Sequence, residues 1–137
     1  PFIAQVAPKS TGREMFNLAW LETQLSDFNL KPQDIQATLV SFTAQSLAAA
    51  INKLNEPVDE VYICGGGVFN DQLMAQLQIA LGPRALHSTE KLGLDPTWVE
   101  ACAFGWLAHQ YINNQPGNLP SVTGASREAV LGALYRP

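Results

Sequence analysis

The sequence predicts an α/β fold that is rich in helix and has a small sheet. Two short segments, 58–64 and 84–88, have the length and the flanking turn residues of strands, and each is followed by a longer helical pattern. Such alternation favours parallel strands covered by helices. Three consecutive glycines, Gly65, Gly66 and Gly67, connect the first strand to the helix after it.

The composition is that of one folded domain, and we expect residues 1–137 to form a single domain. Hydrophobic residues make up 47% of the chain and charged residues 15%, which excludes disorder and leaves a surface with few charges. A net charge of −4, without any cluster of Lys and Arg, argues against a nucleic-acid partner. No signal-peptide pattern and no apolar membrane span are found, so a cytoplasmic location without a membrane partner is expected.

The first half of the chain is predicted to hold two helices. The opening ten residues have two prolines and no periodicity, and are expected to form a linker. Thr11 and Glu14 have capping-box spacing, which predicts a helix over 12–27. Pro32 then precedes a second helix over 34–54, whose middle is rich in alanine and serine. Small side chains there allow another element to approach closely.

The second half begins with the first strand, 58–64, whose apolar residues predict that it is buried. Asn70 is a good N-cap for a helix that ends at Leu81, and Gly82 stops that helix. The strand 84–88 follows. A last long helix is predicted over 95–113, because its first residues are an aspartate N-cap followed by proline.

The tail, 115–137, has four glycine or proline turn points before Ser126 and then a short apolar end over 130–135. No internal repeat or low-complexity tract is present. Two strands of this length do not make a stable sheet alone, so we expect either further strands within this sequence or a sheet that is completed by chain outside it.

The glycine triplet is the strongest indication of function. Without Cβ atoms, the turn allows a ligand to lie against main-chain N–H groups beside the positive end of a helix dipole. That setting favours a phosphate or a nucleoside. The pattern is neither a Walker A loop nor a G-x-G-x-x-G fingerprint. The alternative is that the glycines only permit a tight turn and close helix–strand packing.

Glu100 is the second candidate, because no other Asp, Glu, Lys or Arg lies between Asp95 and Arg127. A carboxylate in such an apolar helix either reaches solvent near the helix N-terminus or accepts hydrogen bonds from a polyhydroxylated substrate.

Other polar groups indicate less. Lys9 and Arg13 lie where a loop enters a helix and either contact a nucleotide or are solvated charges beside a cap. Cys64 and Cys102 lack ligand spacing and are expected to pack in the core. Neither histidine has a carboxylate at ligand spacing, so no metal site is expected in this chain.

Four segments together resemble the C-terminal half of anhydro-N-acetylmuramic acid kinases. They are KSTGREMFNLAWL (9–21), VYICGGGVFN (61–70), LGLDPTWVEACAFGWLA (92–108) and PGNLPSVTGAS (116–126). Those enzymes belong to the superfamily of sugar kinases, actin and heat-shock chaperone ATPases, in which two ribonuclease-H-like lobes close over ATP. The resemblance implies that this chain is the ribonuclease-H-like C-terminal lobe and that the N-terminal lobe, its own partner, is absent.

The resemblance also implies a reaction. The family opens the 1,6-anhydro ring of 1,6-anhydro-N-acetylmuramic acid with water and phosphorylates the 6-hydroxyl from ATP with Mg²⁺, which recycles bacterial cell-wall fragments. Gly65, Gly66 and Gly67 match the superfamily's adenosine motif, with Asn70 just beyond it. Glu100 matches a family glutamate expected to bind the sugar. Lys9 and Arg13 match the K-S-T-G-R-E motif, whose role is not specified.

The phosphate-binding loop of the family, S-G-T-S-x-D-G, does not occur in this sequence, nor do its D-T-G-P-G-N segment and the aspartate that activates water. These parts and the Mg²⁺ ligands are expected in the missing N-terminal lobe, so the 137 residues alone are predicted not to catalyse. Alternatives are another sugar kinase or ATPase of the superfamily, a non-catalytic nucleotide-binding or interaction domain, and a plain α/β packing module. A homodimer also stays open.

Overall fold

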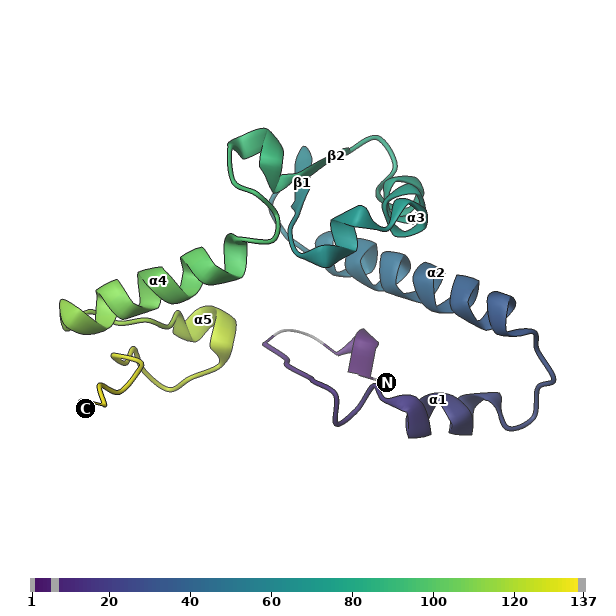
Figure 1. Ribbon diagram of the computed structural model, residues 1–137, viewed down its shortest axis with the longest axis horizontal. Helices are drawn as coiled ribbons and strands as arrows, with labels where there is room; N and C mark the ends of the chain where they lie inside the picture. Colours follow the sequence, from purple (N-terminus) through teal and green to yellow (C-terminus); the bar gives the residue numbers. More distant parts are fainter. Residues whose placement is uncertain (1, 6–7, 136–137) are drawn as a thin grey trace. The chain divides into compact units, whose positions relative to one another are not determined.

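The computed structural model describes residues 2–5 and 8–135 (Figure 1). In chain order, with η marking short 3-10 helices, its elements are η1 (Phe2–Ala4), α1 (Leu18–Leu25), α2 (Pro32–Ile51), β1 (Glu60–Ile63), η2 (Gly66–Phe69), α3 (Asp71–Leu81), β2 (Ala85–Ser88), η3 (Thr89–Leu92), α4 (Val99–Ile112) and α5 (Pro120–Thr123). This helix-rich arrangement with one small sheet agrees with the predicted α/β class.

The chain divides into two compact units. Residues 30–103 form the central unit, and residues up to 29 form the terminal unit together with those from 104 onward. Both strands and the glycine turn lie in the central unit, and α4 supplies residues to both units.

α2 forms where the sequence predicted it. Pro32 occupies the first turn, where its missing N–H has no intrahelical role, and Asp34 lies in the same turn beside free N–H groups. The helix ends at Ile51 rather than at Leu54, and the residues after it form turns.

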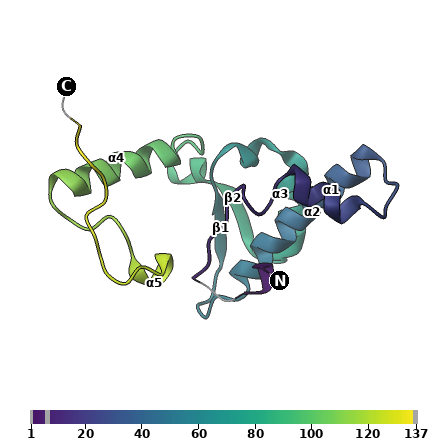
Figure 2. The ribbon, with the colours of Figure 1, turned by 90° about the horizontal axis from the view of Figure 1, so that it is seen from below.

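β1 and β2 form a two-stranded parallel sheet, with Tyr62 opposite His87 (Figure 2). The connection between them contains η2 and α3, which is the crossover that parallel strands require. The predicted parallel pairing is therefore confirmed. Both strands are shorter than the predicted segments 58–64 and 84–88: β1 lacks residues 58, 59 and 64, and β2 lacks residue 84.

The prediction of a buried first strand is wrong. Val61, Tyr62 and Ile63 are only half-buried, and Cys64 is exposed. Cys102 is exposed as well, so neither cysteine packs in the core as predicted. The physical reason is that the buried cluster of the described residues lies between α2 and α3. Val61 and Ile63 pack against this cluster but are only partly buried, and neither cysteine belongs to it.

The core of the central unit lies between α2 and α3. Ala44 and Ala48 of α2 and Leu77 and Leu81 of α3 are buried, and side chains from both strands pack around them. Alanine at the contact lets the two helix axes approach closely, since interaxial distance depends on the side chains between them. The expectation that small residues in α2 receive another element is confirmed.

α1 begins after Asn17 and not at Gly12 as predicted. The Asn17 side chain accepts a hydrogen bond from the N–H of Trp20 (2.9 Å) and is the N-cap. The Glu14 carboxylate accepts from the N–H of Gly12 (2.7 Å), so no capping box forms with Thr11. Asparagine is among the strongest N-caps, and here it defines the first turn.

α4 also begins later than the predicted range 95–113. The Asp95 carboxylate accepts a hydrogen bond from the N–H of Thr97 (2.8 Å), which closes a turn before the helix. Regular α-helix starts at Val99 and ends at Ile112.

Turns in the tail follow the predicted glycine and proline points. α5 ends at Gly124, whose φ of +74° is the left-handed conformation that glycine adopts readily. Asn118 fixes the segment after it by donating to the carbonyl of Arg127 (3.0 Å) and accepting from the N–H of Ala129 (2.6 Å). The expected linker at the start holds η1. Residues 1, 6 and 7 of it, and 136–137 of the tail, lie outside the described residues.

We predict that Leu77→Ala lowers the free energy of unfolding by about 2–5 kcal/mol, because it opens a cavity between α2 and α3. Urea denaturation of the chain measures this. Ile79→Ala on the same helix is the matched control, since that side chain is 74% exposed, and we expect a change within about 0.5 kcal/mol. Equal losses in the two variants would contradict the position of the core.

Candidate functional site

The glycine turn begins where β1 ends. Gly65 has φ +78°, which explains the need for glycine at this position. Its N–H donates to the carbonyl oxygen of Pro96 (2.7 Å), and Pro96 is buried. The N–H of Gly65 is therefore used within the fold, and the turn is fixed to the segment that leads into α4.

Gly66 and Gly67 are exposed and lie open. A Cβ atom built at Gly66 would meet no atom within 4 Å, and one at Gly67 would meet only a methyl group of Leu73, at 3.5 Å. Their N–H groups lie in the first turn of η2, where a helix offers no intrahelical acceptor. A ligand can approach this main chain without displacing a side chain, as the sequence predicted.

The glycines do not lead directly into an α-helix, which corrects the prediction. The 3-10 helix η2 comes between, and Asn70 has an extended conformation (φ −93°, ψ 95°) before α3 begins at Asp71. The positive end of the α3 dipole therefore lies beyond Asn70 and not at the triplet. η2 is too short to have a large helix dipole. A ligand at the glycine turn would therefore meet main-chain N–H groups rather than the end of a long helix.

Asn70 is the N-cap of α3, as predicted. Its side-chain oxygen accepts from the N–H of Leu73 (3.0 Å). The amide nitrogen of Asn70 is then the side-chain group left for a ligand, and the residue also lines a neighbouring hollow.

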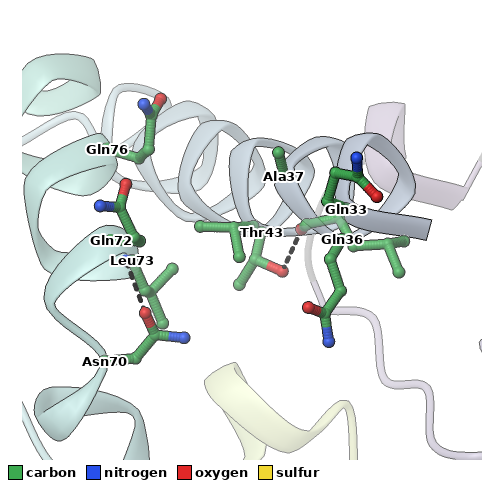
Figure 3. A pocket seen from close by; sticks show the side chains of 10 residues that line it. Gln33, Gln36, Ala37, Thr43, Asn70, Gln72, Leu73 and Gln76 are labelled. Atoms are coloured by element: carbon green, nitrogen blue, oxygen red, sulfur yellow. Dashed lines mark hydrogen bonds between the residues drawn. The ribbon is translucent and has the colours of Figure 1, made fainter. Parts of the chain in front are cut away.

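That hollow has a volume of about 630 Å³ and lies between α2 and α3 (Figure 3). On the α3 side it is lined by Asn70, Gln72, Leu73 and Gln76, and the view shows residues of α2 opposite them. The lining residues from α2 are Gln33, Gln36, Ala37, Leu39, Val40 and Thr43.

Among the described residues, every polar side chain that lines the hollow is an amide or a hydroxyl, and none carries a charge. The sequence motifs did not indicate these glutamines. Gln33, Gln36, Val40 and Thr43 are three or four residues apart and therefore lie on one face of α2. This face lines a hollow only because α2 packs against α3.

Glu100 lies in the first turn of α4 and is exposed. In the described part of the chain its carboxylate has no hydrogen-bond partner or ion pair. Through Pro96, the segment before α4 is bonded to Gly65, so the residues after β1 and after β2 meet at the carboxyl edge of the sheet. Ligands of open α/β sheets bind at this edge.

Asp95 organises the start of this segment. The hydroxyl (2.6 Å) and the N–H (2.8 Å) of Thr97 both donate to its carboxylate. These two hydrogen bonds, the hydroxyl's first, hold the pKa of Asp95 below its ordinary value. The carboxylate is thereby kept ionised and the turn before α4 is closed.

Lys9 and Arg13 lie in the terminal unit. The Lys9 ammonium donates to the carbonyls of Phe2 (3.1 Å) and Ile3 (2.8 Å) and lies over the Phe2 ring. Lys9 thus holds the N-terminal segment through two of its three donors, while Arg13 is exposed.

Lys9 also lines a cavity of about 570 Å³, together with residues 122–124. The structure thereby brings together two of the segments that carry the family resemblance, 9–21 and 116–126.

A charged cluster lies on the sheet. The hydroxyl of Tyr62 donates to the Glu60 carboxylate, and the Lys91 ammonium lies 3.9 Å from Glu60 and 2.8 Å from Nε2 of His87. The Tyr62 hydrogen bond first, and then the charge of Lys91, lower the pKa of Glu60; the pKa of Tyr62 is raised by the same hydrogen bond.

Nε2 of His87 lies next to the Lys91 ammonium group. A positive charge at this position does not suit a nitrogen that would bind a metal ion. Over residues 2–5 and 8–135, no three His, Cys, Asp or Glu side chains are grouped to hold a metal ion. Across the same residues, none of the helices is long and apolar enough to cross a bilayer.

Comparison with known proteins identifies relatives of the whole chain. Residues 1–137 match the family described as anhydro-N-acetylmuramic acid kinase. The chain is 53% identical over 136 residues to a protein of that name from Shewanella pealeana, covering 98% of this chain and 37% of the relative. A namesake from Saccharophagus degradans is 51% identical over 139 residues (100% and 37%), and one from Shewanella loihica 55% over 130 residues (94% and 35%). The chain thus spans little more than a third of these relatives.

We predict that Thr97→Val raises the pKa of Asp95 toward its ordinary value, because the hydroxyl that favours the carboxylate is removed. The folded pKa is lowered, so this interaction stabilises the fold fully above the unfolded-state pKa and is lost as the pH falls through the folded pKa. A carboxyl NMR titration measures it. Thr97→Ser, which keeps the hydroxyl, should retain the low pKa; an unchanged value in the Val variant would contradict this account.

Proposed function

The chain belongs to the anhydro-N-acetylmuramic acid kinase family, and from that premise we propose that it forms the nucleotide-binding, ribonuclease-H-like C-terminal lobe of an ATP-dependent kinase. The full-length protein, located in the bacterial cytoplasm, hydrolyses the 1,6-anhydro ring of 1,6-anhydro-N-acetylmuramic acid and phosphorylates the 6-hydroxyl. This reaction serves cell-wall recycling, and the lobe contributes nucleotide binding to it. The family membership and the parallel β1–α3–β2 unit support this function.

The single observation that carries the nucleotide role is the open glycine turn. Gly66 and Gly67 are exposed at the carboxyl edge of a parallel sheet, and at Gly66 no atom lies within 4 Å of the position that a Cβ would take. Gly65 is fixed by its hydrogen bond to Pro96, so the turn is held in shape before a ligand arrives. A preorganised main-chain surface of this kind suits a nucleoside and the phosphate next to it.

Glu100 is the proposed sugar-binding residue. An exposed carboxylate without a partner in the described part of the chain offers several acceptor sites to the hydroxyl and amide groups of an amino sugar. Its place in the first turn of α4, after the segment bonded to the glycine turn, supports the proposal that sugar and nucleotide bind at one edge of the sheet.

The phosphoryl-transfer machinery is proposed to lie in the rest of the polypeptide. Transfer depends on positioning and on stabilisation of charge around the terminal phosphate. Mg²⁺ would supply part of that charge stabilisation, and its ligands are expected outside this chain. The 137 residues alone are therefore proposed to bind nucleotide without catalysing the reaction.

We predict that Gly66→Val in the full-length protein weakens ATP binding by about ten- to a hundredfold, the equivalent of one or two lost hydrogen bonds to a charged group. A side chain at Gly66 meets no protein atom and its φ is ordinary, so the fold should tolerate it. Calorimetric titration with ATP measures the effect.

Gly105→Ala in α4 is the control, because a Cβ there also meets no atom within 4 Å. We expect its ATP affinity to match wild type. If Gly66→Val bound ATP as wild type does, the turn would have no nucleoside role.

We also predict that Glu100→Gln lowers kcat/KM for the anhydro sugar by about ten- to a hundredfold while ATP affinity is unchanged, since a charged acceptor is lost from the sugar side only. ADP release with a panel of sugars measures this and tests whether another sugar is the substrate. Glu90→Gln, an exposed carboxylate of η3, is the control and should retain full activity. Equal activity of Glu100→Gln and wild type would remove Glu100 from the site.

A further inference from the structure

The α2–α3 hollow adjoins the glycine turn but is not explained by it. Asn70 belongs to both: it follows η2 and lines the hollow. The volume of about 630 Å³ lies within the range of about 300–1,000 Å³ found for small-molecule sites. Half-buried Leu73 and Val40 and the small side chain of Ala37 give it apolar surface, as Figure 3 shows for Leu73 and Ala37.

The charge of the lining limits what can bind. Of the residues that the structure describes, no Lys, Arg, Asp or Glu lines the hollow. A phosphate group would find no cation there, whereas a neutral heterocycle would lose nothing by the absence of charge. The open N–H groups of Gly66 and Gly67, outside the hollow, are the better place for phosphate.

The hydrogen-bonding groups of the hollow are available. In the part of the chain that the structure describes, the side-chain amides of Gln33, Gln36, Gln72 and Gln76 form no hydrogen bond. Thr43 donates its hydroxyl to the carbonyl of Leu39 (2.9 Å), so its oxygen is left as an acceptor. Each glutamine amide offers a donor and an acceptor side by side.

From this arrangement we propose that the hollow binds the base of the nucleotide and that its glutamine amides, Gln36 from α2 and Gln76 from α3 above all, select adenine over guanine. The inference rests on the proposed function. An amide pairs with the N6 amino group and the adjacent N7 of adenine, whereas the same edge of guanine presents two adjacent acceptors, O6 and N7, that require Arg or Lys, and neither is among the described lining residues.

The test uses the full-length protein and three probes: ATP, GTP and inorganic tripolyphosphate, which has no base. We expect Gln36→Leu and Gln76→Leu each to weaken ATP binding by about three- to tenfold, the usual effect of one neutral hydrogen bond. Their preference for ATP over GTP should fall by a similar factor, and tripolyphosphate affinity should not change. The matched control is Gln45→Leu, an exposed glutamine on α2 that does not line the hollow.

The outcomes separate this inference from the function on which it rests. If wild type binds ATP and both hollow variants keep the affinity and base preference of Gln45→Leu, the base lies elsewhere and the inference is overturned while the function stands. If wild type binds neither ATP nor tripolyphosphate, the proposed function fails and the inference with it. A parallel loss of ATP and tripolyphosphate affinity in Gln36→Leu would assign the hollow to phosphate and overturn base selection.

Discussion

The contact between α2 and α3 is the constraint on which the rest of the central unit depends. Ala44 and Ala48 of α2 form one buried cluster with Leu77 and Leu81 of α3. α3 is also part of the crossover between the two parallel strands. The burial between the helices therefore also holds the connection from β1 to β2, and a short sheet is stabilised by helix packing that it could not supply itself.

A second contact joins two loop segments of this unit. The hydrogen bond from Gly65 to Pro96 links the turn after β1 with the segment after β2, and Asp95 closes the turn that follows through Thr97. Both segments belong to the carboxyl edge of the sheet. One main-chain hydrogen bond thus joins the glycine turn to the segment that leads to Glu100 at this edge.

The elements of the site could be anticipated to different degrees. The open turn at Gly66 and the N-cap role of Asn70 followed from glycine's lack of a side chain and from the local preference of asparagine. The glutamines of the hollow could not be found in this way, because Gln36 and Gln76 belong to different helices. Nor could the sequence show that Lys9 binds the carbonyls of Phe2 and Ile3, since a lysine beside a predicted cap has several equally reasonable partners.

By itself, the sequence determined the order of helices and strands, the parallel pairing, the position of the glycine turn and the small-residue face of α2. These depend on periodicity, capping and backbone freedom, which are properties of neighbouring residues. The tertiary structure alone decided that the N–H of Gly65 is occupied, that β1 and both cysteines are not buried, and that α2 and α3 enclose an uncharged hollow. Each of these depends on which distant segments meet, and one-dimensional patterns carry no information on such distances.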